Sequence, residues 1–246
     1  MRLEEFAPID EDLSRRGFLQ GIGAAAAGVG TGAQAKLQPT PATSIPSNPN
    51  AKMLLDVAKK YITDPTELAQ FMAHCASESG NFTQLAEKGD GTREYFNRKY
   101  DAFDTHGRPK PAGAPGVKAA KVLGNTHPGD GERFKGRGFI QVTGRWNYTK
   151  AGERLSQAFK KDIDLVKHPE WLEDPTTAAY ASLWFWLNRV APRVKNFHNT
   201  AQVSKKVNGA VVKTTHQKGR EENFKKYQAA IGKPVQVAQN ESTRVC

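Results

Sequence analysis

Apolar residues recur at helical spacing over most of the chain beyond residue 50. A first pattern runs from Met53 to Ile62. A second follows Asp64, which suits a helix N-cap, with Pro65 in the first turn and Glu67 at the reciprocal capping position. Because Cys75 falls on the apolar stripe of this second helix, we interpret it as a core residue. Further helices are expected near 94–103, 145–158, 174–189, 199–207 and 217–231.

Two stretches interrupt the helical pattern. Residues 104–131 hold several prolines and glycines, so we expect a long surface loop there. The segment from Phe134 to Thr143 is expected to contain a short strand or hairpin. The predicted fold class is therefore mainly α, or α+β with a small β element, in a single domain.

Composition limits the function classes. A mean hydropathy of −0.63, with no run of roughly 18 apolar residues, is typical of a globular chain without a spanning helix. The formal net charge is +11, which favours polyanionic partners, but no helix-turn-helix, zinc-finger or RNA-binding signature indicates nucleic acid. The two cysteines, Cys75 and Cys246, form no metal-binding spacing, and whether they pair is open.

The first 35 residues have the order of an export signal. Ser14 to Gln20 contains the pair Arg15-Arg16, a Gly- and Ala-rich stretch follows, and Ala33-Gln34-Ala35 supplies small residues for a signal peptidase. Residues 1–35 resemble a Tat signal, which implies a periplasmic or extracellular protein without stable membrane insertion. Residues 36–50, rich in proline, are expected to be an extended linker, residues 51–232 the folded domain and residues 233–246 a loose tail.

Glu78 is the first candidate for chemistry. It lies about 70° from the middle of the apolar stripe of its helix, at the border between core and solvent, and Gly80-Asn81 is expected to end that helix. Desolvation and the helix dipole both disfavour a charged carboxylate there, as a general acid requires. A second acid, Glu87, follows nine positions later. Glycosidic hydrolysis needs two carboxylates in different surroundings.

Four segments of the chain resemble glycoside hydrolase family 19, the chitinases and their phage-endolysin relatives. Residues 73–80 are similar to the catalytic-acid helix of the family, and Glu87 has the spacing of its compact members. Residues 136–143, followed by Asn147-Tyr148, are close to the family's Gly-Arg-Gly-x-Ile-Gln run. The last segment is Val207-Asn208-Gly209 with Arg220 further on. The resemblance covers about 51–231 and implies a lysozyme-like, bilobal helical domain with a sugar-binding cleft.

The resemblance also implies roles for individual residues. Glu78 would protonate the leaving oxygen, Glu87 would act as base on a water, with Glu94 as its nearby alternative, and Thr143 would help hold that water. An inverting mechanism of this kind separates the carboxyls by roughly 6.5–9.5 Å and needs no metal or cofactor. Gln141, Asn147, Tyr148 and Asn208 would hydrogen-bond the sugar, and Arg220, a further candidate for the substrate site, could tune a catalytic carboxylate. Two more substrate candidates, Tyr95 and His74, rest on their positions near the acids rather than on the resemblance, and core packing is the alternative for both.

We expect a monomeric enzyme that cleaves a β-1,4-linked N-acetylhexosamine polymer. Compact size, basic charge and the export signal favour peptidoglycan, and chitin is the alternative substrate. A lytic transglycosylase would use a similar Glu-Ser-Gly context but only one acid. A sugar-binding wall protein without activity is a third class, against which the two intact acids argue.

Overall fold

The computed structural model describes residues 48–208 and 214–231. The signal-like segment, most of the linker, Gly209, the tail and Cys246 lie outside the described residues. Helix α2 (Pro49–Ala58) includes the last two residues of the expected linker, Pro49 and Asn50, because Oδ1 of Asn48 accepts hydrogen bonds from the backbone N–H of Asn50 and Ala51. Within the described part, none of the helices is both long and apolar enough to cross a bilayer.

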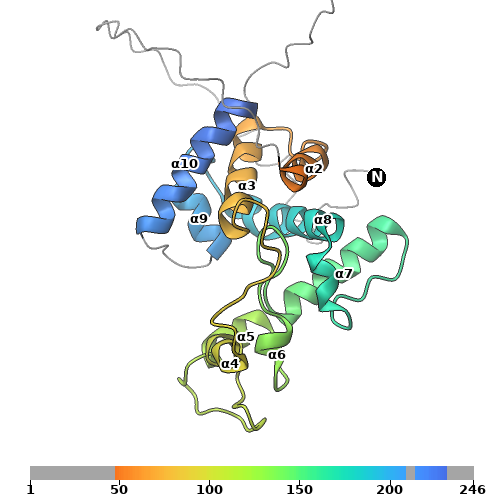
Figure 1. Ribbon diagram of the computed structural model, residues 1–246, viewed down its shortest axis with the longest axis vertical. Helices are drawn as coiled ribbons and strands as arrows, with labels where there is room; N and C mark the ends of the chain where they lie inside the picture. Colours follow the sequence, from red (N-terminus) through yellow and green to blue (C-terminus); the bar gives the residue numbers. More distant parts are fainter. Residues whose placement is uncertain (1–47, 209–213, 232–246) are drawn as a thin grey trace, which may run out of the picture.

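The molecule is mainly helical and has two lobes (Figure 1). The larger lobe holds α2, α3 (Pro65–Glu78), α8 (Pro175–Phe185), α9 (Thr200–Asn208) and α10 (Thr214–Ile231). The smaller lobe holds α4 (Arg93–Tyr100), α5 (Val117–Leu123) and α6 (Asp130–Arg133). Helix α7 (Arg145–Phe159) contacts both α5 and α8 and so connects the two lobes. The fold class predicted from the sequence is confirmed.

Helix starts follow the predicted capping. The Asp64 side chain accepts a hydrogen bond from the backbone N–H of Glu67 at 2.7 Å, and Pro65 occupies the first turn of α3. Asp174 caps α8 in the same way at Thr177 N–H, at 2.8 Å. The carboxylate of Glu67 is buried and accepts a hydrogen bond from Nε1 of Trp186 at 3.1 Å. Sequence and structure therefore agree on where these two helices begin.

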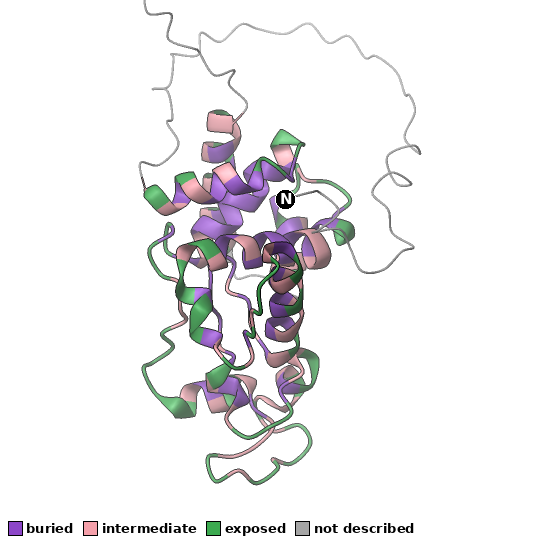
Figure 2. Ribbon diagram, turned by 90° about the vertical axis from the view of Figure 1, so that its right-hand side faces the viewer, coloured by how far each residue is buried: buried purple, intermediate pink, exposed green. Residues whose placement is uncertain are grey.

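The core lies in the larger lobe. Buried residues concentrate in the larger lobe, on α2, α3 and α8 among others, whereas the smaller lobe is largely intermediate or exposed (Figure 2). Cys75 is fully buried in this core, as its place on the apolar stripe predicts. After α8 the chain continues as one π-helical turn, η3 (Trp186–Val190), and a 3-10 turn, η4 (Ala191–Arg193), so the predicted helix over 174–189 changes form near its end.

The expectation of a surface loop over 104–131 is wrong in part. The segment contains the whole of α5 and the start of α6. Gly116 and Gly124 border α5 with φ values of +91° and +68°, and a Cβ on Gly116 would lie 2.7 Å from the carbonyl oxygen of Asp101. The glycines that suggested a loop therefore mark the two ends of a short helix.

The expected β element is a tight hairpin-like turn. Arg137 and Val142 exchange two backbone hydrogen bonds, of 3.0 and 2.7 Å, and Ala86 forms a further antiparallel bridge with Arg137. Within the described residues these bridges stay isolated and build no longer strand. The turn carries residues 138–141 and joins the segment after α3 to the start of α7.

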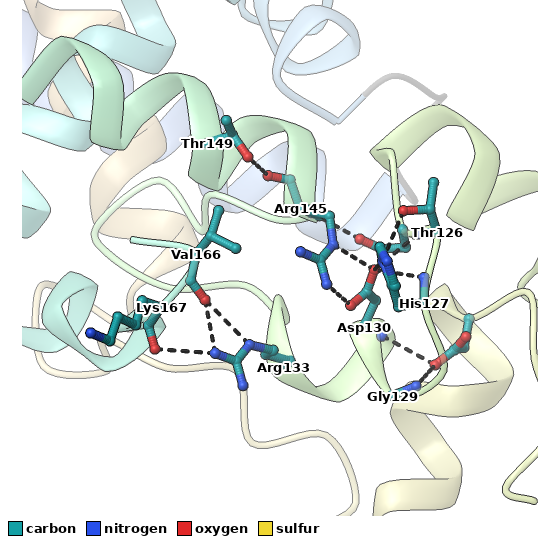
Figure 3. A network of polar contacts seen from close by, with 12 residues as sticks. Thr126, His127, Gly129, Asp130, Arg133, Arg145, Thr149, Val166 and Lys167 are labelled. Atoms are coloured by element: carbon teal, nitrogen blue, oxygen red, sulfur yellow. Dashed lines mark hydrogen bonds and ion pairs between the residues drawn. The ribbon is translucent and has the colours of Figure 1, made fainter. Parts of the chain in front are cut away.

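A polar network fixes the smaller lobe against α7 and the segment that follows it (Figure 3). Both oxygens of the buried Asp130 accept hydrogen bonds from the guanidinium of Arg145, at 2.6 and 2.8 Å. One helical turn further on, Arg133 donates through Nη2 to the carbonyl oxygens of Val166 and Lys167, at 2.9 and 3.1 Å. Bidentate pairing of this kind restricts orientation as well as distance. The position of the smaller lobe is therefore set by directed contacts in addition to apolar packing.

Candidate active site

A cleft of about 1030 Å³ lies between the two lobes. Glu78 and Glu87 both line it, and they are the only carboxylates among its described lining residues. Glu78 is the last residue of α3 in the larger lobe, and Glu87 lies on the connection from α3 to α4. Glu94, the alternative second acid, is exposed on α4 and does not line the cleft. The structure therefore brings together the two acids that the sequence places nine residues apart.

Glu78 is held from the side of α10. The Nη2 group of Arg220 donates to Oε1 of Glu78, and the two side chains are only 8% and 18% exposed. Nε of Arg220 is buried and has no hydrogen-bond partner among the described residues. Beside this pair, Asn223 donates to the hydroxyl of Ser77 at 2.9 Å. Arg220 thus contacts the carboxylate directly, behind the cleft wall.

Glu87 is held from the side of the smaller lobe. Its Oε1 lies 2.6 Å from Nζ of Lys99, and its Oε2 accepts hydrogen bonds from the Tyr100 hydroxyl at 3.1 Å and from the Gly136 N–H at 3.3 Å. The backbone N–H of Glu87 also donates to the carbonyl of Gly136 at 2.8 Å. These contacts fix both the segment and the carboxylate plane.

The tight turn supplies the polar floor of the cleft. Gln141 has a φ of +57°, and its side chain donates to the carbonyl of Gly138 at 3.0 Å. The Thr143 hydroxyl donates to the carbonyl of Gln141 at 2.8 Å. Its own oxygen, Oγ1, can therefore still accept a hydrogen bond from a water or a substrate group. Both side chains line the cleft.

Two neighbouring candidate residues on α7 have different surroundings, one in the cleft and one in the core. Asn147 lines the cleft and donates to the carbonyl of Thr143 at 2.7 Å, while its buried Oδ1 has no partner among the described residues. Tyr148 is fully buried and does not line the cleft, so its prediction as a substrate ligand is not supported. Its hydroxyl donates to the carbonyl of Lys135 at 2.6 Å, and burial raises its pKa well above the ordinary value. Successive helix residues point about 100° apart, so only one of the two can face the cleft.

Asn208 lines the cleft at the end of α9 and donates to the carbonyl of Ser204 at 3.0 Å. Two further candidates lie outside the cleft lining. His74 is fully buried between the carbonyl of Gln70 and the Ser204 hydroxyl, at 2.8 and 3.0 Å. The Tyr95 hydroxyl accepts a hydrogen bond from Lys99 at 3.1 Å, and its ring packs edge-on against Phe96. For His74 the structure therefore favours packing, whereas Tyr95 is half-buried and lies outside both the cleft lining and the core.

Sequence reasoning missed several cleft residues. Lys99 and Tyr100 contact Glu87, and Lys118 and Phe185 complete parts of the wall. No motif marks these residues, because they reach the cleft only through the packing of α4, α5 and α8. A group of His, Cys, Asp or Glu side chains suited to a metal ion is not found among the described residues.

A bilobal helical domain with two acids facing one polar cleft is typical of lysozyme-like glycosidases. The family model described as chitinase class I matches residues 58–205. The chain belongs to glycoside hydrolase family 19.

Individual relatives agree with this assignment. An endochitinase of Arabidopsis thaliana is 30% identical over 127 residues, which cover 51% of this chain and 37% of the relative. A family 19 domain-containing protein of Haemophilus influenzae is 25% identical over 185 residues, covering 71% of this chain and 84% of the relative. The chain spans about a third of the length of the plant chitinases that it matches. The crystal structure of a bacterial family 19 chitinase has a TM-score of 0.50 at 19% identity, over 77% of this chain and 91% of that chain, and supports the fold.

Proposed function

We propose that the protein hydrolyses a β-1,4-linked N-acetylhexosamine polymer with inversion of configuration. The observation that carries this proposal is the placement of Glu78 and Glu87 on one cleft between two lobes. Each carboxylate has its own anchor, Arg220 for Glu78 and Lys99 for Glu87. Acid and base roles require two carboxyl groups in separate environments with room for a water between them.

In the proposed reaction, Glu78 gives a proton to the leaving glycosidic oxygen as the bond to the anomeric carbon breaks. Among the described residues, Arg220 donates to Oε1 of Glu78, and Oε2 is the oxygen that would carry the proton. Glu87 takes a proton from the water that attacks the opposite face of the sugar. The Thr143 oxygen helps to orient this water, and proton exchange with solvent resets both acids.

The side chains around the acids suit an N-acetylated sugar. The unpartnered Oδ1 of Asn147 can accept a hydrogen bond from an acetamido N–H or a hydroxyl. Gln141 and Asn208 add amide groups on the same cleft. These groups are complementary to the acetamido and hydroxyl groups of an N-acetylhexosamine chain.

Peptidoglycan is the substrate that we favour, because the cleft is lined by lysines as well as by the two acids. Chitin is the second candidate, because the plant relatives are described as chitinases. We also propose that the chain is exported, on the twin-arginine pattern at Arg15-Arg16. Peptidoglycan lies outside the cytoplasmic membrane, so an exported enzyme would have direct access to it.

Product analysis tests the proposal. Purified peptidoglycan and chitin are digested in parallel, and the products are identified by mass spectrometry, with Glu78→Gln as the inactive control. We expect products with free reducing ends, inverted in configuration by proton NMR of the fresh digest, together with turbidity loss with walls and little release from chitin. Efficient cleavage of chitin, with no cleavage of the walls, would make chitin the favoured substrate in place of peptidoglycan. Anhydro-sugar ends, with activity that survives Glu87→Gln, would indicate a transglycosylase and contradict hydrolysis.

A further inference from the structure

The wall of the cleft on the side of the smaller lobe carries an excess of positive charge. Lys88, Lys99 and Lys118 line it, from the connection after α3, from α4 and from α5. Glu78 and Glu87 are the only acidic side chains among the described lining residues. Both acids are already compensated, Glu78 by Arg220 and Glu87 by Lys99.

Lys88 and Lys118 remain without such compensation. Both residues are exposed, and in the part of the chain that the structure describes neither ammonium group forms an ion pair or hydrogen bond. They lie on the two sides of Lys99 along the chain, on elements that meet at the cleft. Two uncompensated cations beside a low-dielectric wall raise the local concentration of anions.

Apart from the two acids and the lysines, the polar lining among the described residues is neutral. It includes amide and hydroxyl groups from Gln141, Thr143, Asn147 and Asn208, and Phe185 adds an apolar surface. A bound glycan would therefore meet both neutral hydrogen-bonding groups and cationic groups in the same cleft. This combination fits a chain with neutral sugar hydroxyls and acetamido groups that also bears acidic substituents.

We infer that Lys88 and Lys118 bind carboxylate groups carried by the sugar units of the substrate. The inference rests on the proposed function and narrows its substrate to N-acetylhexosamine polymers with acidic substituents, such as lactyl or peptide carboxylates. Neutral chitin offers no group of this kind and gains nothing from the two lysines. Because the lysines are exposed, each contact is modest and weakens with salt.

The test compares two double variants of the full chain. Lys88→Gln/Lys118→Gln removes the cleft cations. Lys60→Gln/Lys121→Gln is the matched control, because it makes the same change in net charge, and its two lysines are exposed but do not line the cleft. Lys121 even shares α5 with Lys118. Binding to insoluble peptidoglycan and to chitin beads is measured by depletion on ice at 50 and 300 mM salt, and hydrolysis of both is measured alongside.

We expect the cleft variant to bind peptidoglycan about tenfold more weakly at low salt, with most of this difference lost at high salt. Its binding to chitin should change less than about twofold, and the control should match the parent on both materials. Equal losses on both materials, unchanged binding to peptidoglycan, or no binding of the parent to walls would overturn the inference. If the parent cleaves neither polymer but binds walls in a lysine-dependent way, the proposed hydrolysis fails and the lysine inference stands.

Discussion

The ammonium of Lys99 lies 2.6 Å from Oε1 of Glu87, and the hydroxyl of the next residue, Tyr100, lies 3.1 Å from Oε2. The same ammonium is 5.1 and 4.9 Å from the ring centres of Tyr95 and Tyr100. Burial alone would lower the pKa of Lys99, but hydrogen bonds to Glu87 and the two tyrosines outweigh it and raise the pKa. Burial raises the pKa of Tyr100 to about 12. Near neutral pH both groups therefore act as hydrogen-bond donors to Glu87.

We predict that Lys99→Met lowers kcat for glycan hydrolysis roughly ten- to a hundredfold, because a base held loosely activates water poorly. The value of KM should change by less than about threefold, since the substrate still meets the amide-lined wall. Lys99→Arg should recover part of the loss because it keeps a cation at Glu87. Steady-state kinetics on a soluble oligomer measures both constants. A rise in kcat would mean that the ion pair restrains the base and would contradict the prediction.

The pair between Glu78 and Arg220 should also contribute to stability. A double-mutant cycle with Glu78→Gln and Arg220→Gln is expected to give a coupling energy of about 2 kcal/mol, because both partners are largely buried. Urea unfolding of the four proteins supplies the free energies of unfolding. The exposed pair of Lys52 and Asp56 is the control, and its coupling should stay below about 0.5 kcal/mol. Equal coupling in the two cycles would show that burial adds nothing to the Glu78 pair.

Gly136 lies where an added side chain would push against residues of the candidate active site. A Cβ there would meet Oε1 of Gln141 at 2.7 Å and Oε2 of Glu87 at 3.3 Å. We predict that Gly136→Ala lowers kcat/KM at least about tenfold, because it moves one or both side chains. The control is Gly219→Ala in α10, where an added Cβ would meet no atom within 4 Å. This substitution should raise the free energy of unfolding by about 0.5–1 kcal/mol without loss of activity. Normal activity of Gly136→Ala would mean that Gln141 and Glu87 tolerate the displacement.

The helices could be predicted because their signals are local. Asp64 and Asp174 each precede a proline and an apolar stripe, and both cap helices as predicted. The exceptions are α5 and α6, of seven and four residues, and α5 is bordered by Gly116 and Gly124, so their patterns are too short to distinguish from a loop. Local rules therefore place the long helices and miss these two short ones, of which α5 forms part of the cleft.

The site could be predicted only where a motif carries it. Glu78, Gln141 and Asn147 line the cleft as expected, whereas Tyr148 does not, because the direction of a side chain from α7 depends on how that helix packs. The contact of Lys99 with Glu87 could not be predicted, because it depends on how α4 packs against the segment that carries Glu87. The spacing of the two acids along the chain indicates a pair, and the groups that hold them are set by tertiary contacts.

His74 gives the fold a specific pH dependence. It is fully buried between Gln70 and Ser204, and burial lowers its pKa from 6.5 to about 4, helped by the charge of Arg220 and opposed by the Gln70 carbonyl. The unfolded chain binds a proton here below about pH 6.5, whereas the folded protein does so only near pH 4. The stability that neutral His74 contributes is therefore complete above pH 6.5 and is lost as the pH falls toward 4.

We expect the free energy of unfolding to fall by about 3 kcal/mol through this residue between pH 7 and pH 4. Denaturant unfolding at several pH values measures this slope for the parent and for His74→Gln, which removes the titrating ring. The variant should be less stable at pH 7 but should lose less stability on acidification. His106→Gln, at an exposed histidine, is the matched control and should keep the slope of the parent. Parallel pH curves for the parent and His74→Gln would show that the buried ring does not titrate between these limits.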